Sequence, residues 1–292
     1  MTETQLTHFD RYRGEAATRS GPASYIDTGG DGPAALFVHG VGTSSYLWRH
    51  VIAQMAGERR CVAVDLPLHG RTPAAAGQDF SLGALAGFLA GFCDAAGLAE
   101  VDLVANDTGG AVAQILAARQ PGRLRTLTLT NCETHDNVPP RAFLPAVLLA
   151  RAGLLARMGP RLLRDLPRAR RRVYGSGYQD VSRLPLEVVR AWLEPLVGTP
   201  AAARQFQRWV ALLRARDLLA AEPALRQLQV PTLIVWGTGD VFFHRKWAYW
   251  LRDTIPGAAA VTEIPGARLF FPDERATELT AALRQHWHAH VR

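Results

Sequence analysis

An aspartate stands at the turn of a strand–turn–helix pattern near the middle of the chain. Residues 101–105 form an apolar run typical of a buried strand, Asp107 follows at the turn, and Gly109 and Gly110 open a helix of small residues. A strained turn of this kind lifts one side chain to the top of a parallel sheet. A carboxylate raised in this way can attack a carbon that bears a leaving group, or it can move protons. The pattern also fits a plain turn in which Asp107 caps the helix.

Apolar strand-like runs alternate with helical patterns along most of the chain, which is typical of an α/β protein with a mainly parallel sheet. Between Glu133 and about Pro223 the alternation stops, and Leu, Ala and Arg recur at helical spacing. We therefore expect an α/β core of residues 1–133 and 224–292, with a helical lid, residues 134–223, inserted in it. The lid would cover the carboxyl ends of the strands, where open sheets bind ligands. The expected strands are residues 24–27, 35–38, 61–64, 101–105, 127–130, 232–236 and 259–264.

The composition, with 48% hydrophobic and 20% charged residues, is typical of a globular protein. The net charge of +7 comes mainly from arginine, and the densest cluster, in residues 161–172, is interpreted as a solvated helix face because no nucleic-acid-binding motif accompanies it. No run approaches the ~20 apolar residues of a membrane span. The first 20 residues lack a signal-peptide core, and the three dispersed cysteines favour a reducing compartment. We expect a cytoplasmic monomer or homodimer with no nucleic-acid or membrane partner.

Four segments resemble the motifs of a known family. They are residues 39–49, HGVGTSSYLWR; residues 65–72, DLPLHGRT; residues 106–110, NDTGG; and residues 236–240, WGTGD. In this order they resemble the haloalkane dehalogenase and epoxide hydrolase branch of the α/β-hydrolase fold. The resemblance implies a mainly parallel, twisted sheet flanked by helices, with an inserted helical lid. It also implies that Asp107 is the nucleophile and that Asp240 is an acid of the catalytic triad.

Three positions depart from the pattern of that family. Val41 and Thr108 stand where dehalogenases commonly have the Asn and Trp that hold the departing halide, and neither side chain offers an N–H donor. Gly42 replaces a proline of the epoxide hydrolase motif. Arg268 stands about where the family has its catalytic histidine. Haloalkane dehalogenation is therefore not expected of this chain.

The replacement at Arg268 changes the chemistry that is expected. An aspartate that displaces a leaving group becomes an ester, and freeing it requires a base that takes a proton from water. Arginine stays protonated and cannot be that base. If Arg268 faces Asp107, the two would form a bidentate pair that favours the carboxylate form. The candidate bases are Glu133 and His135, where the lid begins, and His244, although each histidine also fits an exposed position.

The predicted catalytic residues are Asp107, Asp240, Arg268, Glu133 and His135. The residues expected to bind the substrate are His39, Val41, Thr108, Asp136, Phe242 and Phe243. The apolar side chains among them favour an apolar small molecule. No cofactor is expected, because the chain has neither a G-x-G-x-x-G motif after its first strand nor a P-loop, and no metal site is expected.

Three functions stay open. The first is acid–base chemistry of a lyase, isomerase or cyclase at Asp107. The second is hydrolysis of the epoxide hydrolase or dehalogenase type with another base. The third is binding without catalysis. The missing histidine favours the first over the second, and the intact Asp107 and Asp240 favour an enzyme over a binder.

Overall fold

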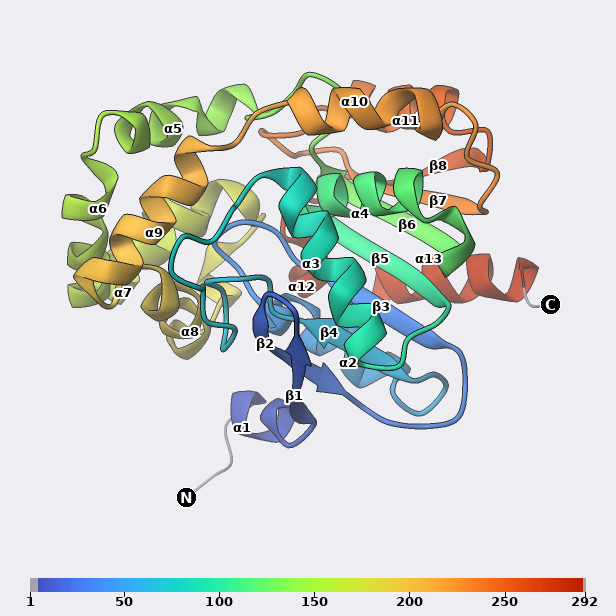
Figure 1. Ribbon diagram of the computed structural model, residues 1–292, viewed down its shortest axis with the longest axis horizontal. Helices are drawn as coiled ribbons and strands as arrows, with labels where there is room; N and C mark the ends of the chain where they lie inside the picture. Colours follow the sequence, from blue (N-terminus) through green and yellow to red (C-terminus); the bar gives the residue numbers. More distant parts are fainter. Residues whose placement is uncertain (1–4, 291–292) are drawn as a thin grey trace.

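The computed structural model describes residues 5–290, which fold around one eight-stranded sheet with the strand order β1-β2-β4-β3-β5-β6-β7-β8 (Figure 1). Strands β3 to β8 run parallel, and β1 and β2 add an antiparallel hairpin at one edge. All seven expected strands are present, and the sequence missed β1. The strands are β1 (Arg13–Thr18), β2 (Gly21–Asp27), β3 (Ala34–Val38), β4 (Cys61–Val64), β5 (Val101–Asp107), β6 (Leu124–Cys132), β7 (Thr232–Gly237) and β8 (Ala258–Ile264).

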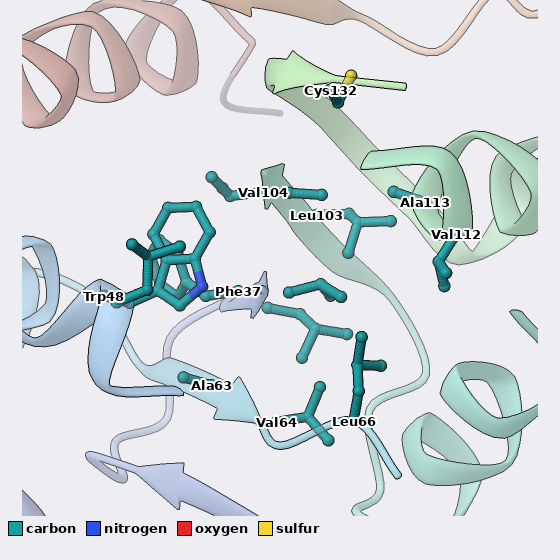
Figure 2. Close-up of a cluster of buried hydrophobic side chains, with 14 of the residues drawn as sticks. Phe37, Trp48, Ala63, Val64, Leu66, Leu103, Val104, Val112, Ala113 and Cys132 are labelled. Carbon is teal, nitrogen blue, oxygen red and sulfur yellow. The ribbon is translucent and has the colours of Figure 1, made fainter. Parts of the chain in front are cut away.

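Helices from both sides bury the central strands. Leu103 of β5 lies towards Val112 on one side, whereas its neighbour Val104 points towards Trp48 on the other (Figure 2). Every residue of β3 and β5 is buried. Strands that are buried on both faces need nearly continuous apolar runs, and both strands are mainly apolar. The helices outside the β6–β7 connection are α1 (Gln5–Asp10), α2 (Arg49–Met55), α3 (Leu82–Ala95), α4 (Thr108–Arg119), α11 (Lys246–Thr254), α12 (Phe271–Glu274) and α13 (Ala276–Ala289).

All of the regular secondary structure between β6 and β7 is helical. Helices α5 to α9 gather at one side of the molecule, where α9 packs on α5, α6 and α8, whereas α10 lies over the core (Figure 1). A short π-helical turn over Arg170–Tyr174 follows α7. The helices of this connection are α5 (Leu144–Arg151), α6 (Leu155–Met158), α7 (Leu166–Ala169), α8 (Leu186–Val197), α9 (Pro200–Ala211) and α10 (Arg216–Leu225).

Helix α10 packs on α4 and α3 of the core. The carboxylate Oδ2 of Asp217 accepts a hydrogen bond of 2.9 Å from the backbone N–H of Gly83, at the start of α3. We therefore propose that the lid ends before Arg216, earlier than the expected boundary at residue 223. The helical pattern of the sequence is the same on both sides of this boundary, so periodicity alone does not mark it.

The inserted segment is tied down over the strand ends. The hydroxyl of Tyr174 donates to the carbonyl of Gly42, just beyond β3, at 2.8 Å. The backbone N–H of Phe270, beyond β8, donates to the carbonyl of Gly177 at 2.8 Å. Both contacts lie beyond the carboxyl ends of strands, where parallel sheets place their sites.

Among residues 5–290, no single helix is long and apolar enough to cross a membrane. One pair of segments, Arg141–Arg151 and Leu155–Arg164, passes that test by length and composition only when taken together, and it is bent by 93°.

Candidate active site

Asp107 occupies the strained turn that the sequence predicted. It ends β5 with a φ of 56° and a ψ of −137°, and α4 begins at the next residue. A positive φ is costly for a residue with a side chain and is typical of functional turns. The side chain makes no capping hydrogen bond to α4, so the alternative of a plain helix cap does not describe this turn.

Glycines allow the turn to pack closely against its neighbours. A Cβ at Gly110 would lie 2.3 Å from the Cβ of Cys132, and one at Gly40 would lie 2.3 Å from Oδ2 of Asp107. Backbone N–H groups of Thr108 and Val41 lie close to the Asp107 carboxylate and favour its charged form, which lowers its pKa. These two donors could also stabilise an oxyanion formed at the Asp107 carbonyl.

Gly40→Ala is expected to displace the Asp107 carboxylate, because the new methyl group has no room beside it. We expect a loss of about 1–3 kcal/mol in the free energy of unfolding, as for other overpacked sites, together with loss of activity. Urea denaturation and a turnover assay would measure both effects. The control is Gly87→Ala on the exposed side of α3, where a Cβ meets nothing within 4 Å. That variant should be about 1 kcal/mol more stable than the wild type.

Strand pairing brings Glu133 next to this turn. Asp107 pairs with Cys132 across the parallel strands β5 and β6. The residues that follow them, Thr108 after β5 and Glu133 after β6, therefore lie side by side. The hydroxyl of Thr108 donates to Oε1 of Glu133 at 2.9 Å. The other oxygen, Oε2, is buried without a hydrogen-bond partner among the described residues. The carboxyl of Glu133 therefore has one oxygen fixed and one free.

Asp240 is held by its own set of donors after β7. The side-chain amide of Asn131, at the end of β6, donates to Oδ2 of Asp240 at 2.7 Å, and the backbone N–H of Phe242 donates to Oδ1 at 2.8 Å. Asn131 was not singled out from the sequence, although it ends an expected strand beside the strand that leads to Asp240.

Asp107, Glu133 and Asp240 are buried close enough to influence one another. Loss of water is the main cause that raises the pKa of all three carboxyls, to about 7 for Glu133 and about 6 for Asp240. The pKa of Asp107 is raised well above its usual range, because the charges of Glu133 and Asp240 add to the effect of burial. Near neutral pH the site therefore retains protons and has acid and base forms available.

Arg268 does not form the carboxylate pair with Asp107 that the sequence analysis considered. Its Nη1 donates to the carbonyl of Tyr178 at 3.1 Å and to that of Gly175 at 3.5 Å, both in the inserted segment. Its charge lowers the pKa of Asp240, but burial outweighs this and the net shift is upward. The guanidinium therefore ties the insertion to the core, and the pair with Asp107 is not formed.

His39 and His69 fix loops around the site. Nε2 of His39 accepts from the backbone N–H of Leu66 at 3.0 Å, and Nε2 of His69 accepts from that of Gly42 at 3.2 Å. Burial lowers the pKa of both imidazoles, that of His69 to about 3. Both rings are neutral and their acceptor nitrogens are already used.

His135 lines a surface groove whose lining residues do not include Asp107 or Glu133. Its Nδ1 lies 2.7 Å from Oε2 of Glu222, and its ring packs on that of Trp250 with centroids 4.9 Å apart. This groove has a volume of about 670 Å³, and Asp136, Phe242 and His244 also line it. None of the described hydrogen bonds or ion pairs links His135 to Asp107. Phe243, by contrast, is buried, and its carbonyl accepts from the indole of Trp236.

A metal site has little support in the described part of the chain. No three His, Cys, Asp or Glu side chains within residues 5–290 come together in a way that could hold a metal ion. His286 and His290 approach each other with ring centroids 4.8 Å apart, without a third ligand.

The family model of the alpha/beta hydrolase fold matches residues 33–275. The chain belongs to the alpha/beta hydrolase fold family. The expected fold is thereby confirmed, and so is the expectation of an α/β-hydrolase-fold enzyme.

Individual relatives agree with this assignment. Haloalkane dehalogenase 2 of Mycobacterium bovis is 29% identical over 274 residues, 90% of each chain. A haloalkane dehalogenase of Mesorhizobium japonicum is 41% identical over 101 residues, 35% of this chain and only 32% of that protein. The pimeloyl-[acyl-carrier protein] methyl ester esterase of Nitrosomonas europaea is 29% identical over 81% of this chain and 89% of its own length. The structure of a haloalkane dehalogenase from Bradyrhizobium elkani superposes with a TM-score of 0.79 at 23% identity, covering 95% of this chain and 99% of that one, and shows the shared fold.

Proposed function

We propose that this alpha/beta hydrolase opens an epoxide or a similar strained C–O bond in an apolar small molecule. Asp107 is the nucleophile, and Glu133 takes the place of the missing histidine. The observation that supports this most directly is the buried Glu133 carboxyl, with Oε1 held by Thr108 beside Asp107 and Oε2 unpartnered. A carboxyl whose pKa is raised to about 7 can both give and take a proton at neutral pH.

In the first step the Asp107 carboxylate attacks an epoxide carbon and the ring C–O bond breaks. Glu133 gives its proton to the epoxide oxygen as that oxygen leaves. The products are a hydroxyalkyl ester at Asp107 and an ionised Glu133. The reactive state therefore carries one proton on Glu133 and none on Asp107, which is one of the arrangements open to carboxyls that share protons.

In the second step the Glu133 carboxylate takes a proton from water as the water attacks the ester carbonyl. The oxyanion is stabilised by the N–H groups of Val41 and Thr108. Collapse breaks the acyl C–O bond, and the proton that remains on the attacking oxygen passes to the leaving alkoxide. A diol is released, and the Asp107 carboxylate and the protonated Glu133 are restored. Because Asp107 is uncharged as an ester, the charge of Asp107 no longer opposes the ionisation of Glu133 at this stage.

This scheme also disfavours halides as substrates. A halide leaves as an anion that needs hydrogen-bond donors, whereas an alkoxide needs a proton. Val41 and Thr108 supply no side-chain N–H, and each missing donor of this kind costs about 10²- to 10³-fold in rate. We expect short bromoalkanes to release halide no faster than the buffer blank in a chromatographic assay. Halide release at enzymatic rates would show that other groups bind the anion.

A second candidate is acid–base catalysis without hydrolysis, as in a lyase, isomerase or cyclase. It is favoured by the raised pKa of Asp107, since a protonated Asp107 can donate a proton but cannot attack carbon. The two candidates differ in whether a covalent ester forms at Asp107.

The test is intact-protein mass spectrometry with a panel of reactive terminal epoxides. We expect Glu133→Gln to form the ester at Asp107 more slowly than the wild type, because it lacks the acid of the first step. The adduct should nevertheless accumulate in the variant, because the base for the second step is also missing, whereas the wild type hydrolyses it. The control Glu15→Gln changes an exposed carboxylate on β1 and should behave as the wild type. Turnover of an epoxide with no adduct in either protein would support the acid–base alternative. Equal ester hydrolysis in Glu133→Gln and the wild type would mean that Glu133 is not the base.

A further inference from the structure

The outer helices of the insertion expose an unusual set of large apolar side chains. Leu144 and Leu148 of α5 are 40% and 56% exposed. Leu154, just before α6, is 41% exposed, and Met158, at the end of α6, is 47% exposed. Scattered exposed leucines are ordinary, but several in one short segment indicate a contact surface. We refer to residues 141–164 as the outer segment.

The outer segment is also strongly basic. It contains five arginines and no Asp or Glu, so all its formal charge has one sign. All five arginines are exposed: Arg141, Arg151, Arg157, Arg161 and Arg164. The guanidinium of Arg151 donates to backbone carbonyls, whereas the other four arginines make no hydrogen bond or ion pair within the described part of the chain.

Packing explains which side of α5 is free. Val147 and Ala150 are buried in a small cluster with Val210 of α9. Leu144, Leu148 and Arg151 follow one another at helical spacing on the face that α9 leaves uncovered. Helices α5 and α6 lie at the periphery of the molecule in Figure 1, so this face is open to a large partner.

We propose that the outer segment docks this protein on an anionic lipid surface, with its leucines in the interface and its arginines against the headgroups. An apolar face rimmed by basic residues is typical of helices that lie in the membrane interface. The expectation of no membrane partner rested on the lack of a spanning segment, and peripheral binding needs none. A second copy of the chain fits less well, because a symmetric contact would place like charges against one another. The proposal does not depend on the chemistry assigned to Glu133.

The test is co-sedimentation of the full chain with lipid vesicles at low ionic strength. We expect binding to vesicles that contain 30% phosphatidylglycerol and at least about tenfold weaker binding to pure phosphatidylcholine, because each arginine near the surface contributes about a fivefold factor. High salt should release the protein, since it screens the charges.

Two variants separate the apolar and the basic contributions. Leu148→Ser with Leu154→Ser should weaken binding by at least about tenfold, because the inserted leucines are lost. Arg157→Gln with Arg161→Gln should weaken it by about fivefold per arginine. The matched control is Leu219→Ser, another exposed leucine but on α10, which should bind as the wild type.

Failure of the wild type to bind anionic vesicles would overturn the proposal. So would equal weakening by Leu219→Ser, because the contact would then not be specific to the outer segment. A dimer in light scattering that the double leucine variant abolishes would identify a second copy as the occupant and would also overturn it.

Discussion

Asp107→Asn is expected to lower turnover by at least about 10³-fold while the protein stays folded. Asparagine has nearly the shape of aspartate but can neither attack carbon nor accept a proton. Since Asp107 is buried beside Glu133 and Asp240, removing its ionisable group also relieves repulsion among the three carboxyls. Turnover of the best epoxide and the melting temperature would be measured together.

The matched control for this variant is Asp253→Asn on α11, a change of the same kind at an exposed residue. It should leave turnover unchanged. If Asp107→Asn keeps full activity, the carboxylate at the turn is structural and no reaction is routed through it.

Glu133→Gln is expected to stabilise the protein at pH 8 and to have little effect at pH 5. The folded protein raises the pKa of Glu133 from 4.5 to about 7, so between these values it binds more protons than the unfolded chain. The stability of the wild type therefore falls as the pH rises through this window. At about 1.4 kcal/mol per pH unit, the penalty above pH 7 is of the order of 3 kcal/mol, and glutamine avoids it.

Urea denaturation at the two pH values would measure this difference. Glutamine keeps an oxygen that can accept the hydrogen bond from Thr108, so the local packing is preserved. The control Glu15→Gln should change the free energy of unfolding by less than about 0.5 kcal/mol at both pH values. A gain for Glu133→Gln that is equal at pH 5 and pH 8 would mean that Glu133 is not a retained acid.

The sequence predicted the parts of the fold that are encoded locally. Buried parallel strands need apolar runs, so β3 and β5 could be located from their residues alone. Strand β1 was missed because most of its residues are half-buried or exposed at an edge of the sheet and carry no clear alternation. The earlier end that we propose for the lid, before Arg216, is not marked in the sequence, because α10 has the same helical pattern as the lid although it packs on the core.

The position of the site could be predicted from the sequence, but the hydrogen bonds between its residues could not. The motif around Asp107 located the turn, since glycines are required where Cys132 and the β3 backbone come close. The bond between Thr108 and Glu133 depends on which residues β5 and β6 place side by side, and a one-residue shift would break it. The direction of the Arg268 side chain depends on carbonyls of the inserted segment that are 90 and 93 positions away in the sequence. Neither contact is visible in a linear motif.

The most direct measurement is a pH titration of the glutamate side-chain carboxyls. Nuclear magnetic resonance monitors it on protein labelled with ¹³C at glutamate. We predict one carboxyl that titrates with a pKa near 7 in the wild type, is absent in Glu133→Gln and persists in Glu15→Gln. This signal would show that Glu133 holds a proton at the pH where it has to donate it. A wild type in which every glutamate is fully ionised by pH 6 would contradict the account, because Glu133 would then have no proton to give.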